Sequence, residues 1–252
     1  MRFHSKRSAF RSVRDIGLFL TSARSDARLE ALRHEFAACP AAFDRLYESA
    51  PQNDPWASGS PRYHYQRRKY DALLALLPAR TYRRALDLGC GLGLFTERLS
   101  RRAEEVVGVD ISAVAIHHAA ERTRALKNVE LRQGNLMTLG PELDGRFDLI
   151  VIADTLYYLR PPIRDDVLKS AAARIARLLT PDGVLMVVNH YFPLPNAETR
   201  LTLRIHRAFQ WSPAFVQLSE HRRAFFLATL LGNAAPASVM GGSMADTSAR
   251  PA

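Results

Sequence analysis

The chain has 252 residues, of which 47% are hydrophobic, and it carries a formal net charge of +10 at pH 7. This length and composition predict one globular domain with a hydrophobic core of ordinary size, and they exclude an intrinsically disordered chain. No apolar run is long enough to cross a bilayer, so we expect no membrane partner.

The positive charge and the two cysteines bear on whether the protein binds nucleic acid or a metal ion. The charge fits an anionic partner or a solvated basic surface, but the basic residues are scattered and do not interleave with aromatic ones over a long surface. We therefore do not expect nucleic acid as a partner. Cys39 and Cys90 lack metal-ligand spacing, which favours reduced structural thiols in a cytoplasmic protein without a metal site.

Residues 1–41 are predicted to form a basic helical extension. Arginine and serine are frequent in its first part and acids are few, a composition that also resembles an organelle transit peptide. Charged residues at helical spacing from Asp26 to Phe36 favour an accessory helix instead. A Ser/Gly/Pro stretch from Ala57 to Pro61 then predicts a loop, and a helix follows from Tyr65 to Leu77.

A strand that runs into a glycine-rich turn is the feature around which the chain is organised. The segment from Ala85 to Gly93 reads Ala-Leu-Asp-Leu-Gly-Cys-Gly-Leu-Gly, and Leu94–Leu99 continues at helical spacing. Such a strand–turn–helix presents backbone N–H groups to a ligand, and its glycines let the ligand approach closely. The next strand, Glu105–Asp110, ends in a carboxylate that can accept hydrogen bonds from a ribose. A tight turn in an ordinary α/β protein is the alternative for the glycine motif alone.

Strands and helices alternate through the rest of the chain, which is typical of an α/β fold. We expect strands at 129–133, 147–153 and 184–188, and helices at 112–124, 163–179 and 198–209. Val216–Ser219 and Arg223–Leu231 read as two strands joined by a short turn. The segment 233–252, rich in Ala, Ser, Gly and Pro, is predicted to be a disordered tail.

Polar and aromatic residues follow two of these strands. Asp154, Tyr157 and Tyr158 come directly after the strand at 147–153, and His190 follows the strand at 184–188. The carboxyl ends of parallel strands meet at one sheet edge, where ligands bind in open α/β folds. These residues are therefore candidates for catalysis and substrate binding. A single histidine is more often structural, and one of the two tyrosines is expected to pack in the core.

The pattern Asp-Leu-Gly-Cys-Gly-Leu-Gly from Asp87, followed by Val-Val-Gly-Val-Asp-Ile-Ser from Val106, resembles the class I S-adenosylmethionine-dependent methyltransferases. The resemblance implies a Rossmann-like, seven-stranded doubly wound sheet with a C-terminal antiparallel hairpin, spanning residues 42–232. It implies S-adenosylmethionine as cofactor, bound through its amino-acid part, ribose and adenine by Asp87, Gly89, Gly91, Gly93, Asp110, Ile111, Asn135 and Leu136.

Two of the predicted cofactor residues, Arg68 and Asn135, also have a structural alternative. Arg68 can pair with the carboxylate of the cofactor through its guanidinium group, or it can belong to a solvated basic face. Asn135 can accept a hydrogen bond from the adenine amino group, or it can be a turn residue after a strand.

A second resemblance concerns the methyl acceptor. Asp54-Pro55-Trp56, Ser60-Pro61, Tyr65 with Arg68-Lys69, and the run from Asp154 to Leu159 resemble the nodulation-type (NodS-like) methyltransferases. That family N-methylates a de-N-acetylated chitooligosaccharide, which implies an amino-sugar amine as a small-molecule acceptor. Asp154, with His190, would then accept a proton or orient the amine, and Tyr65, Tyr157 and Tyr158 would line the acceptor channel. O-methylation of a natural-product hydroxyl, methylation of RNA and non-catalytic cofactor binding remain as alternatives.

Overall fold

A computed structural model describes residues 13–35, 39–159, 163–192, 196–223 and 225–234. Most of the predicted tail at 233–252 lies outside these residues. Two residues of that segment are described, Asn233 at the end of the last strand and Ala234 after it. No helix in the described ranges is long and apolar enough to cross a membrane.

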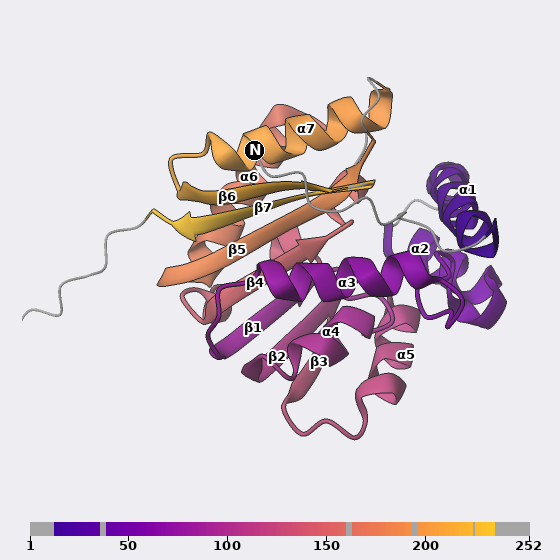
Figure 1. Cartoon of the computed structure of the whole chain (residues 1–252), viewed down its shortest axis with the longest axis horizontal. Helices are drawn as coiled ribbons and strands as arrows, with labels where there is room; N and C mark the ends of the chain where they lie inside the picture. The colour runs from indigo at the N-terminus through magenta and orange to yellow at the C-terminus, as the bar shows by residue number, and fades with distance from the viewer. Residues whose placement is uncertain (1–12, 36–38, 160–162, 193–195, 224, 235–252) are drawn as a thin grey trace, which may run out of the picture.

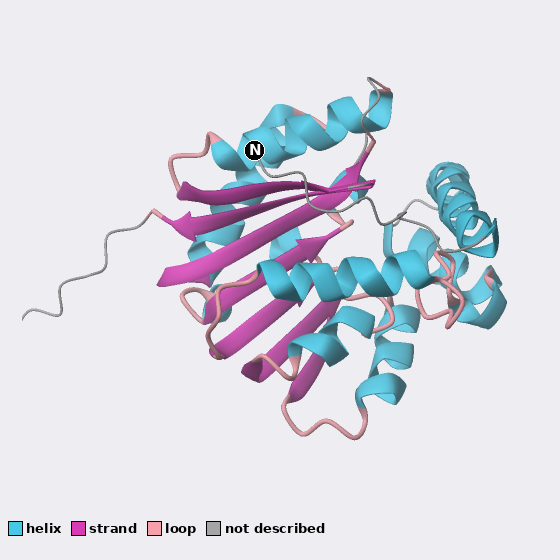
Figure 2. Ribbon diagram, in the orientation of Figure 1, coloured by secondary structure: helices cyan, strands magenta, loops and turns pink. Residues whose placement is uncertain are grey.

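A seven-stranded sheet forms the centre of the molecule, in the order β3-β2-β1-β4-β5-β7-β6 (Figures 1 and 2). The five strands from β3 to β5 in this order are parallel, and β7 is antiparallel to both β5 and β6. This arrangement confirms the predicted fold, including its C-terminal hairpin. The strands are β1 Tyr82–Leu88, β2 Ala103–Asp110, β3 Val129–Gln133, β4 Phe147–Ala153, β5 Leu179–Tyr191, β6 Phe215–Arg223 and β7 Phe225–Asn233.

Helices cover both faces of the sheet, as expected for a doubly wound fold (Figure 2). They are α1 Val13–Glu35, α2 Cys39–Ser49, α3 His64–Leu76, α4 Leu94–Leu99, α5 Ala113–Thr123, α6 Asp165–Leu178 and α7 Ala197–Gln210. The described part of the chain also contains four short 3₁₀ helices, η1 Pro51–Asn53, η2 Leu136–Thr138, η3 Pro141–Leu143 and η4 Leu156–Tyr158.

The central strand β4 shows how the core is divided between the two faces. Ile150 and Ile152 pack on the side of α6 and α7, whereas Leu149 and Val151 pack on the side of α3 and α4. Side chains alternate along a strand, so a strand buried on both faces must be apolar at nearly every position. This explains the continuous apolar run in the sequence.

β5 begins five residues earlier than the sequence suggested, at Leu179 instead of Val184. Its first residues pair with the start of β4 across a register shift between Phe147 and Leu149. Gly183 lies there, and a Cβ on it would be 2.9 Å from the carbonyl oxygen of Thr180. The strand pairing is irregular at the start of β5 and the backbones pack closely there, so the hydrophobic pattern of the sequence does not indicate where the strand begins.

α1 and α2 lie beyond the carboxyl edge of the parallel strands (Figure 1). Leu29 of α1 packs against Phe43 and Leu46 of α2, and the same cluster reaches Ala115 of α5. Ser112 caps α5 by accepting a hydrogen bond from the Ala115 N–H, and it donates its hydroxyl to Asp44 of α2 at 2.6 Å. The N-terminal helices are thus joined to the edge where ligands bind in this type of fold.

Candidate active site

The glycine turn after β1 is fixed to the end of β2. Gly89, Gly91 and Gly93 have φ values of +76°, +51° and +73°, which side chains rarely allow. The carboxylate of Asp110 accepts hydrogen bonds from the N–H of Gly91 at 2.9 Å and from the N–H of Ser112 at 3.0 Å. The turn and the acid predicted from the sequence are therefore one hydrogen-bonded unit.

Gly89 is also the point of closest approach to the loop after β4. A Cβ there would lie 2.2 Å from Thr155 Oγ1, in addition to the backbone strain at positive φ. We expect Gly89→Ala to cost about 2–4 kcal/mol of stability and to weaken S-adenosylmethionine binding at least 10-fold. Thermal unfolding and titration calorimetry measure the two effects.

Gly145→Ala is the matched control, because Gly145 has φ of +65° and no atom lies within 4 Å of the point that an added Cβ would occupy. It carries the backbone strain without the collision, and we expect a loss of only about 1 kcal/mol with binding unchanged. Equal losses for the two variants would refute the steric argument.

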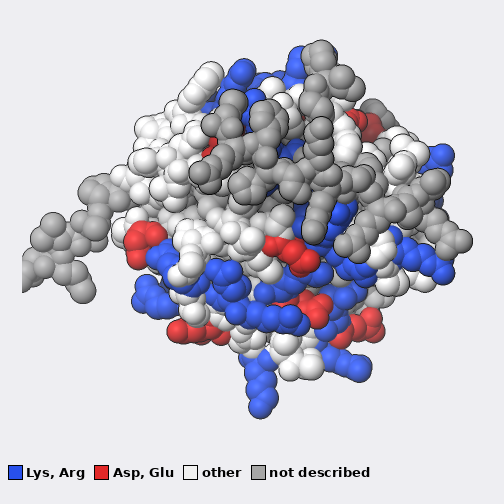
Figure 3. Space-filling model, viewed as in Figure 1, with Lys and Arg blue, Asp and Glu red and all other residues white. Residues whose placement is uncertain are grey.

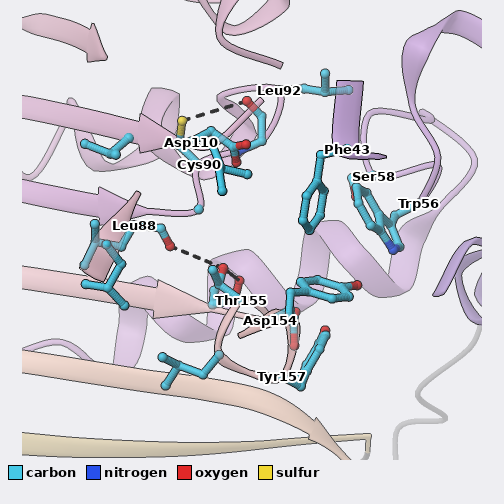
Figure 4. A pocket seen from close by; sticks show the side chains of 18 of the residues that line it. Phe43, Trp56, Ser58, Leu88, Cys90, Leu92, Asp110, Asp154, Thr155 and Tyr157 are labelled. Atoms are coloured by element: carbon cyan, nitrogen blue, oxygen red, sulfur yellow. Dashed lines mark hydrogen bonds between the residues drawn. The ribbon is translucent and has the colours of Figure 1, made fainter. Parts of the chain in front are cut away.

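A cavity of about 1180 Å³ runs along the carboxyl edge of the sheet. This exceeds the roughly 300–1,000 Å³ of most ligand pockets and leaves room for a cofactor and an acceptor together. Figure 4 shows Asp110 on one side, Asp154 and Tyr157 on another, and Phe43 and Trp56 facing them. Ten predicted site residues line this cavity: Gly89, Gly91, Asp110, Ile111, Asn135, Leu136, Asp154, Tyr157, Tyr158 and His190.

Two predicted residues of α3 do not line the cavity. Tyr65 is buried, and its hydroxyl donates a hydrogen bond to the Phe225 carbonyl at 3.1 Å. Arg68 is half-buried, while Gln66 and Tyr70 of the same helix do reach the cavity. Residues 66 and 70 share one helix face, and residue 68 points about 200° away from residue 66. The structure thus does not support the substrate role of Tyr65 or the carboxylate-binding role of Arg68.

Asp87 and Gly93 support the glycine turn from behind instead of lining the cavity. Asp87 accepts a hydrogen bond from Thr96 Oγ1 at 2.7 Å, and burial raises the pKa of its carboxyl to about 7. Gly93 precedes α4, and a Cβ on it would be 3.1 Å from the Cβ of Ala119. Their predicted contribution to cofactor binding would be indirect, through the position of the turn.

At the predicted adenine end, Asn135 combines the two readings of the sequence. Its side-chain oxygen accepts a hydrogen bond from the Met137 N–H at 2.9 Å, so it caps η2 as a turn residue. It also lines the cavity beside Leu136, and an amide oxygen has two lone pairs. The second lone pair and the amide NH₂ group can still form hydrogen bonds with an adenine, and this contact stays a prediction.

Asp154 directly follows β4 and has the left-handed conformation, with φ of +55°. Its N–H donates to the Val188 carbonyl at 2.9 Å, which ties it to β5. Oδ2 accepts a hydrogen bond from the Lys69 ammonium group of α3. Oδ1 is buried, has no hydrogen-bond partner and lies 4.0 Å from Nε2 of His190. A non-glycine residue at positive φ is costly, and such strain concentrates at functional sites.

The surroundings of Asp154 and His190 lower the pKa of both groups, which favours an ionised carboxylate and a neutral imidazole. Burial alone would raise the pKa of the Asp154 carboxyl, but the Lys69 ammonium group beside it holds that pKa below its ordinary value. Burial lowers the pKa of the His190 imidazole, although the nearby Asp154 opposes this. The arrangement therefore presents an ionised carboxylate next to a neutral imidazole, a pairing suited to acid–base chemistry.

Aromatic rings surround these two residues. The Tyr157 ring lies parallel to the His190 ring, with centroids 6.2 Å apart and an interplanar angle of 18°. Tyr158 and Trp56 donate hydrogen bonds to Oδ1 of Asp26 in α1, at 2.5 Å and 2.9 Å. Burial raises the pKa of Asp26, while these two hydrogen bonds oppose the rise. The long N-terminal helix is thereby fixed to the part of the cavity wall formed by Tyr158 and Trp56.

The cavity wall is acidic although the protein is strongly basic. Figure 3 shows Lys and Arg side chains over much of one face, with Asp and Glu among them. Of the described residues, those that line the cavity include no Lys or Arg, but they include Glu30, Asp54, Asp110 and Asp154. Such a wall attracts cations and repels phosphates.

Comparison with known protein families and proteins agrees with this geometry. Residues 86–187 match the family described as "Methyltransferase domain". Nodulation protein S of Azorhizobium caulinodans is 30% identical over 140 residues, which is 56% of this chain. The match spans 64% of that protein's length, which is less than two thirds. A ubiquinone biosynthesis O-methyltransferase of Alkalilimnicola ehrlichii is 30% identical over 197 residues, 74% of each chain.

A solved structure resembles the fold. It is the N-methyltransferase NodS from Bradyrhizobium japonicum WM9 in complex with S-adenosyl-L-homocysteine, with a TM-score of 0.63 and 21% identity. The match covers 77% of this chain and 97% of that chain.

Proposed function

Because this chain belongs to the class I S-adenosylmethionine-dependent methyltransferases, we propose that it N-methylates a small-molecule amine. The leading acceptor is the free amine of a de-N-acetylated chitooligosaccharide. The observation that carries the proposal is the acceptor end of the cavity, where the unpartnered Oδ1 of Asp154 faces a neutral His190 and no described Lys or Arg lines the wall. This environment suits an amine that becomes cationic.

The cofactor fits the glycine-turn end of the cavity. Gly89 and Gly91 line the cavity there, and Thr155 and Tyr47 lie where side chains on these two glycines would be. The turn would hold the amino-acid part of S-adenosylmethionine, and Asp110 the ribose hydroxyls through lone pairs left over from its backbone contacts. Ile111, Asn135 and Leu136 would hold the adenine. When bound, S-adenosylmethionine supplies an electrophilic methyl group on a sulfonium.

The residues at the acceptor end would prepare and orient the amine. An amine attacks only in its neutral form, and His190, neutral because it is buried, can take the proton from an incoming ammonium group. Methylation then places the positive charge on nitrogen. Oδ1 of Asp154 can accept a hydrogen bond from that nitrogen and stabilise the charge where it develops.

A His190→Gln variant tests the base. Burial lowers the pKa of His190, so the neutral imidazole should persist below pH 6.5, and kcat of the wild-type enzyme should fall only at more acidic pH. We expect the variant to lose this acidic limb and to turn over about 100-fold more slowly. Measuring kcat from about pH 5 to 9 checks both effects. An unchanged profile in the variant would exclude His190 as the base.

Two acceptors that differ by one acetyl group test the proposed function. The enzyme is incubated with S-adenosylmethionine and either a fully N-acetylated chitooligosaccharide or the same oligosaccharide lacking one acetyl group. Release of S-adenosylhomocysteine should require the free amine. Turnover of both compounds, or of neither, would reject the amino sugar as acceptor.

O-methylation is the second candidate, because the O-methyltransferase relative matches the chain over a longer stretch than the nodulation protein does. A catechol and the corresponding aromatic amine, offered in parallel, separate the two. Methylation of RNA is not favoured, since the cavity wall would repel phosphates.

A further inference from the structure

Lys69 is buried, whereas the other lysines in the described residues lie at the surface. Only four of the 35 basic residues are lysines. Lys127 and Lys169 are exposed, whereas the Lys69 side chain is 0% exposed in the middle of α3. Removing an ammonium group from water costs several kcal/mol unless a partner compensates. The position of Lys69 therefore needs a specific explanation.

The contacts of Lys69 place it behind the acceptor site. Its Nζ donates a hydrogen bond to Oδ2 of Asp154 and lies 5.9 Å from the centre of the Phe226 ring. Lys69 is not part of the cavity wall, while Asp154 is. One carboxylate oxygen is thus held from behind by a cation, and the other, Oδ1, remains without a hydrogen-bond partner on the side of His190.

Stability alone explains this ion pair poorly. Buried ion pairs are often no more stabilising than apolar side chains of similar volume. The pair also lies beside the strained Asp154 backbone, at the end of the strand where this fold places catalytic groups. These observations favour a functional reason for burying the lysine.

We propose that Lys69 is a positioning residue, which holds Oδ2 of the Asp154 carboxylate from behind, keeps that group ionised and leaves Oδ1 without a side-chain hydrogen-bond partner. This inference rests on the proposed role of Asp154 in methyl transfer. Without the lysine, burial would favour the protonated carboxyl, which donates a hydrogen bond and carries no charge. The other titratable groups that act on Asp154 from the surrounding elements are His190 of β5, Asp26 of α1, Tyr65 and Tyr70 of α3, and Tyr157 and Tyr158 of η4.

A direct test observes the carboxyl group without any acceptor. The full-length protein is labelled with ¹³C at the aspartate carboxyl groups, and the Asp154 signal is identified by its absence in Asp154→Asn. In the wild-type protein this signal should not titrate between about pH 5 and 9. In Lys69→Met it should titrate within that range. A wild-type signal that titrates there, or a folded Lys69→Met protein whose Asp154 stays ionised, would overturn the proposal.

Kinetics test the functional consequence. We expect Lys69→Met to lower kcat about 100-fold and to move the acidic limb of the kcat profile to higher pH, with the Kd for S-adenosylmethionine changed less than about 3-fold. Lys127→Met is the control, since it removes an exposed lysine. In an Asp154→Asn background, Lys69→Met should cause no further loss of kcat. A folded Lys69→Met enzyme with wild-type kcat and pH profile would contradict the positioning role.

The two tests separate this inference from the proposed function. If Lys69→Met does not fold, the titration of the wild-type protein still decides whether Asp154 is held ionised. If the amino-sugar acceptors are not methylated, the amine proposal fails. The carboxyl titration needs no acceptor and still shows whether Lys69 keeps Asp154 ionised.

Discussion

Asp154→Asn is expected to lower kcat about 100-fold or more while leaving the Kd for S-adenosylmethionine nearly unchanged. The amide keeps the size of the side chain and can still accept a hydrogen bond from Lys69, so the fold should persist. It removes the negative charge beside the nitrogen that becomes cationic. Asparagine is preferable to alanine, because alanine would leave the buried Lys69 ammonium without its partner.

Calorimetry and single-turnover kinetics measure the two quantities for Asp154→Asn. Asp182→Asn is the control, because Asp182 is 75% exposed and its nearest ion-pair contact, with Arg80, is 3.9 Å long. A variant that loses affinity for S-adenosylmethionine as strongly as it loses kcat would assign Asp154 to cofactor binding instead of the acceptor.

The second large effect is expected at the other end of the cavity. Asp110→Ala removes two hydrogen bonds to backbone N–H groups and the predicted ribose contact. Hydrogen bonds to charged groups contribute about 1.5–3 kcal/mol each, so the Kd for S-adenosylmethionine should rise at least 100-fold. Titration calorimetry on the folded variant measures the change.

Loss of affinity alone does not separate the ribose contact from support of the glycine turn. A cofactor analogue without the ribose hydroxyl groups does so. The wild-type protein should bind S-adenosylhomocysteine more tightly than its deoxyribose analogue, and Asp110→Ala should bind the two about equally. If the variant still distinguishes the two ligands as the wild type does, Asp110 does not contact the ribose.

The fold was predictable because its signals are local. Buried parallel strands such as β4 give continuous apolar runs, and the glycine turn followed by an acid at the end of the next strand is more specific than the turn alone. The acid at the end of β2 follows from the same motif, and the structure places Asp110 against Gly91 as part of one unit.

The acceptor end was only partly predictable, because it is built from contacts distant in sequence. Asp26 meets Tyr158 across 132 positions, and nothing in the sequence near Asp26 indicates this contact. Lys69 stands in a run of basic residues in which Arg68 was the predicted cofactor ligand. The rotation of α3 decides which of these neighbours faces Asp154, and that rotation is set by packing against the sheet.

The same reasoning applies to Tyr65. An aromatic residue before the first strand was expected to face the acceptor, but its ring packs on Phe225 with centroids 6.1 Å apart. An aromatic side chain serves equally well in a core and in a binding site. Only the tertiary structure distinguishes the two uses.

The most direct test of the proposed methyl transfer is to locate the transferred methyl group. S-adenosylmethionine carrying a ¹³C-labelled methyl group is incubated with the singly de-N-acetylated chitooligosaccharide, with Asp154→Asn as the reference. The carbon shift of the product distinguishes a methyl on nitrogen from one on oxygen. We predict ¹³C on the amine nitrogen with the wild-type enzyme and very little with the variant. Label on a hydroxyl oxygen, or equal labelling by both enzymes, would contradict the proposal.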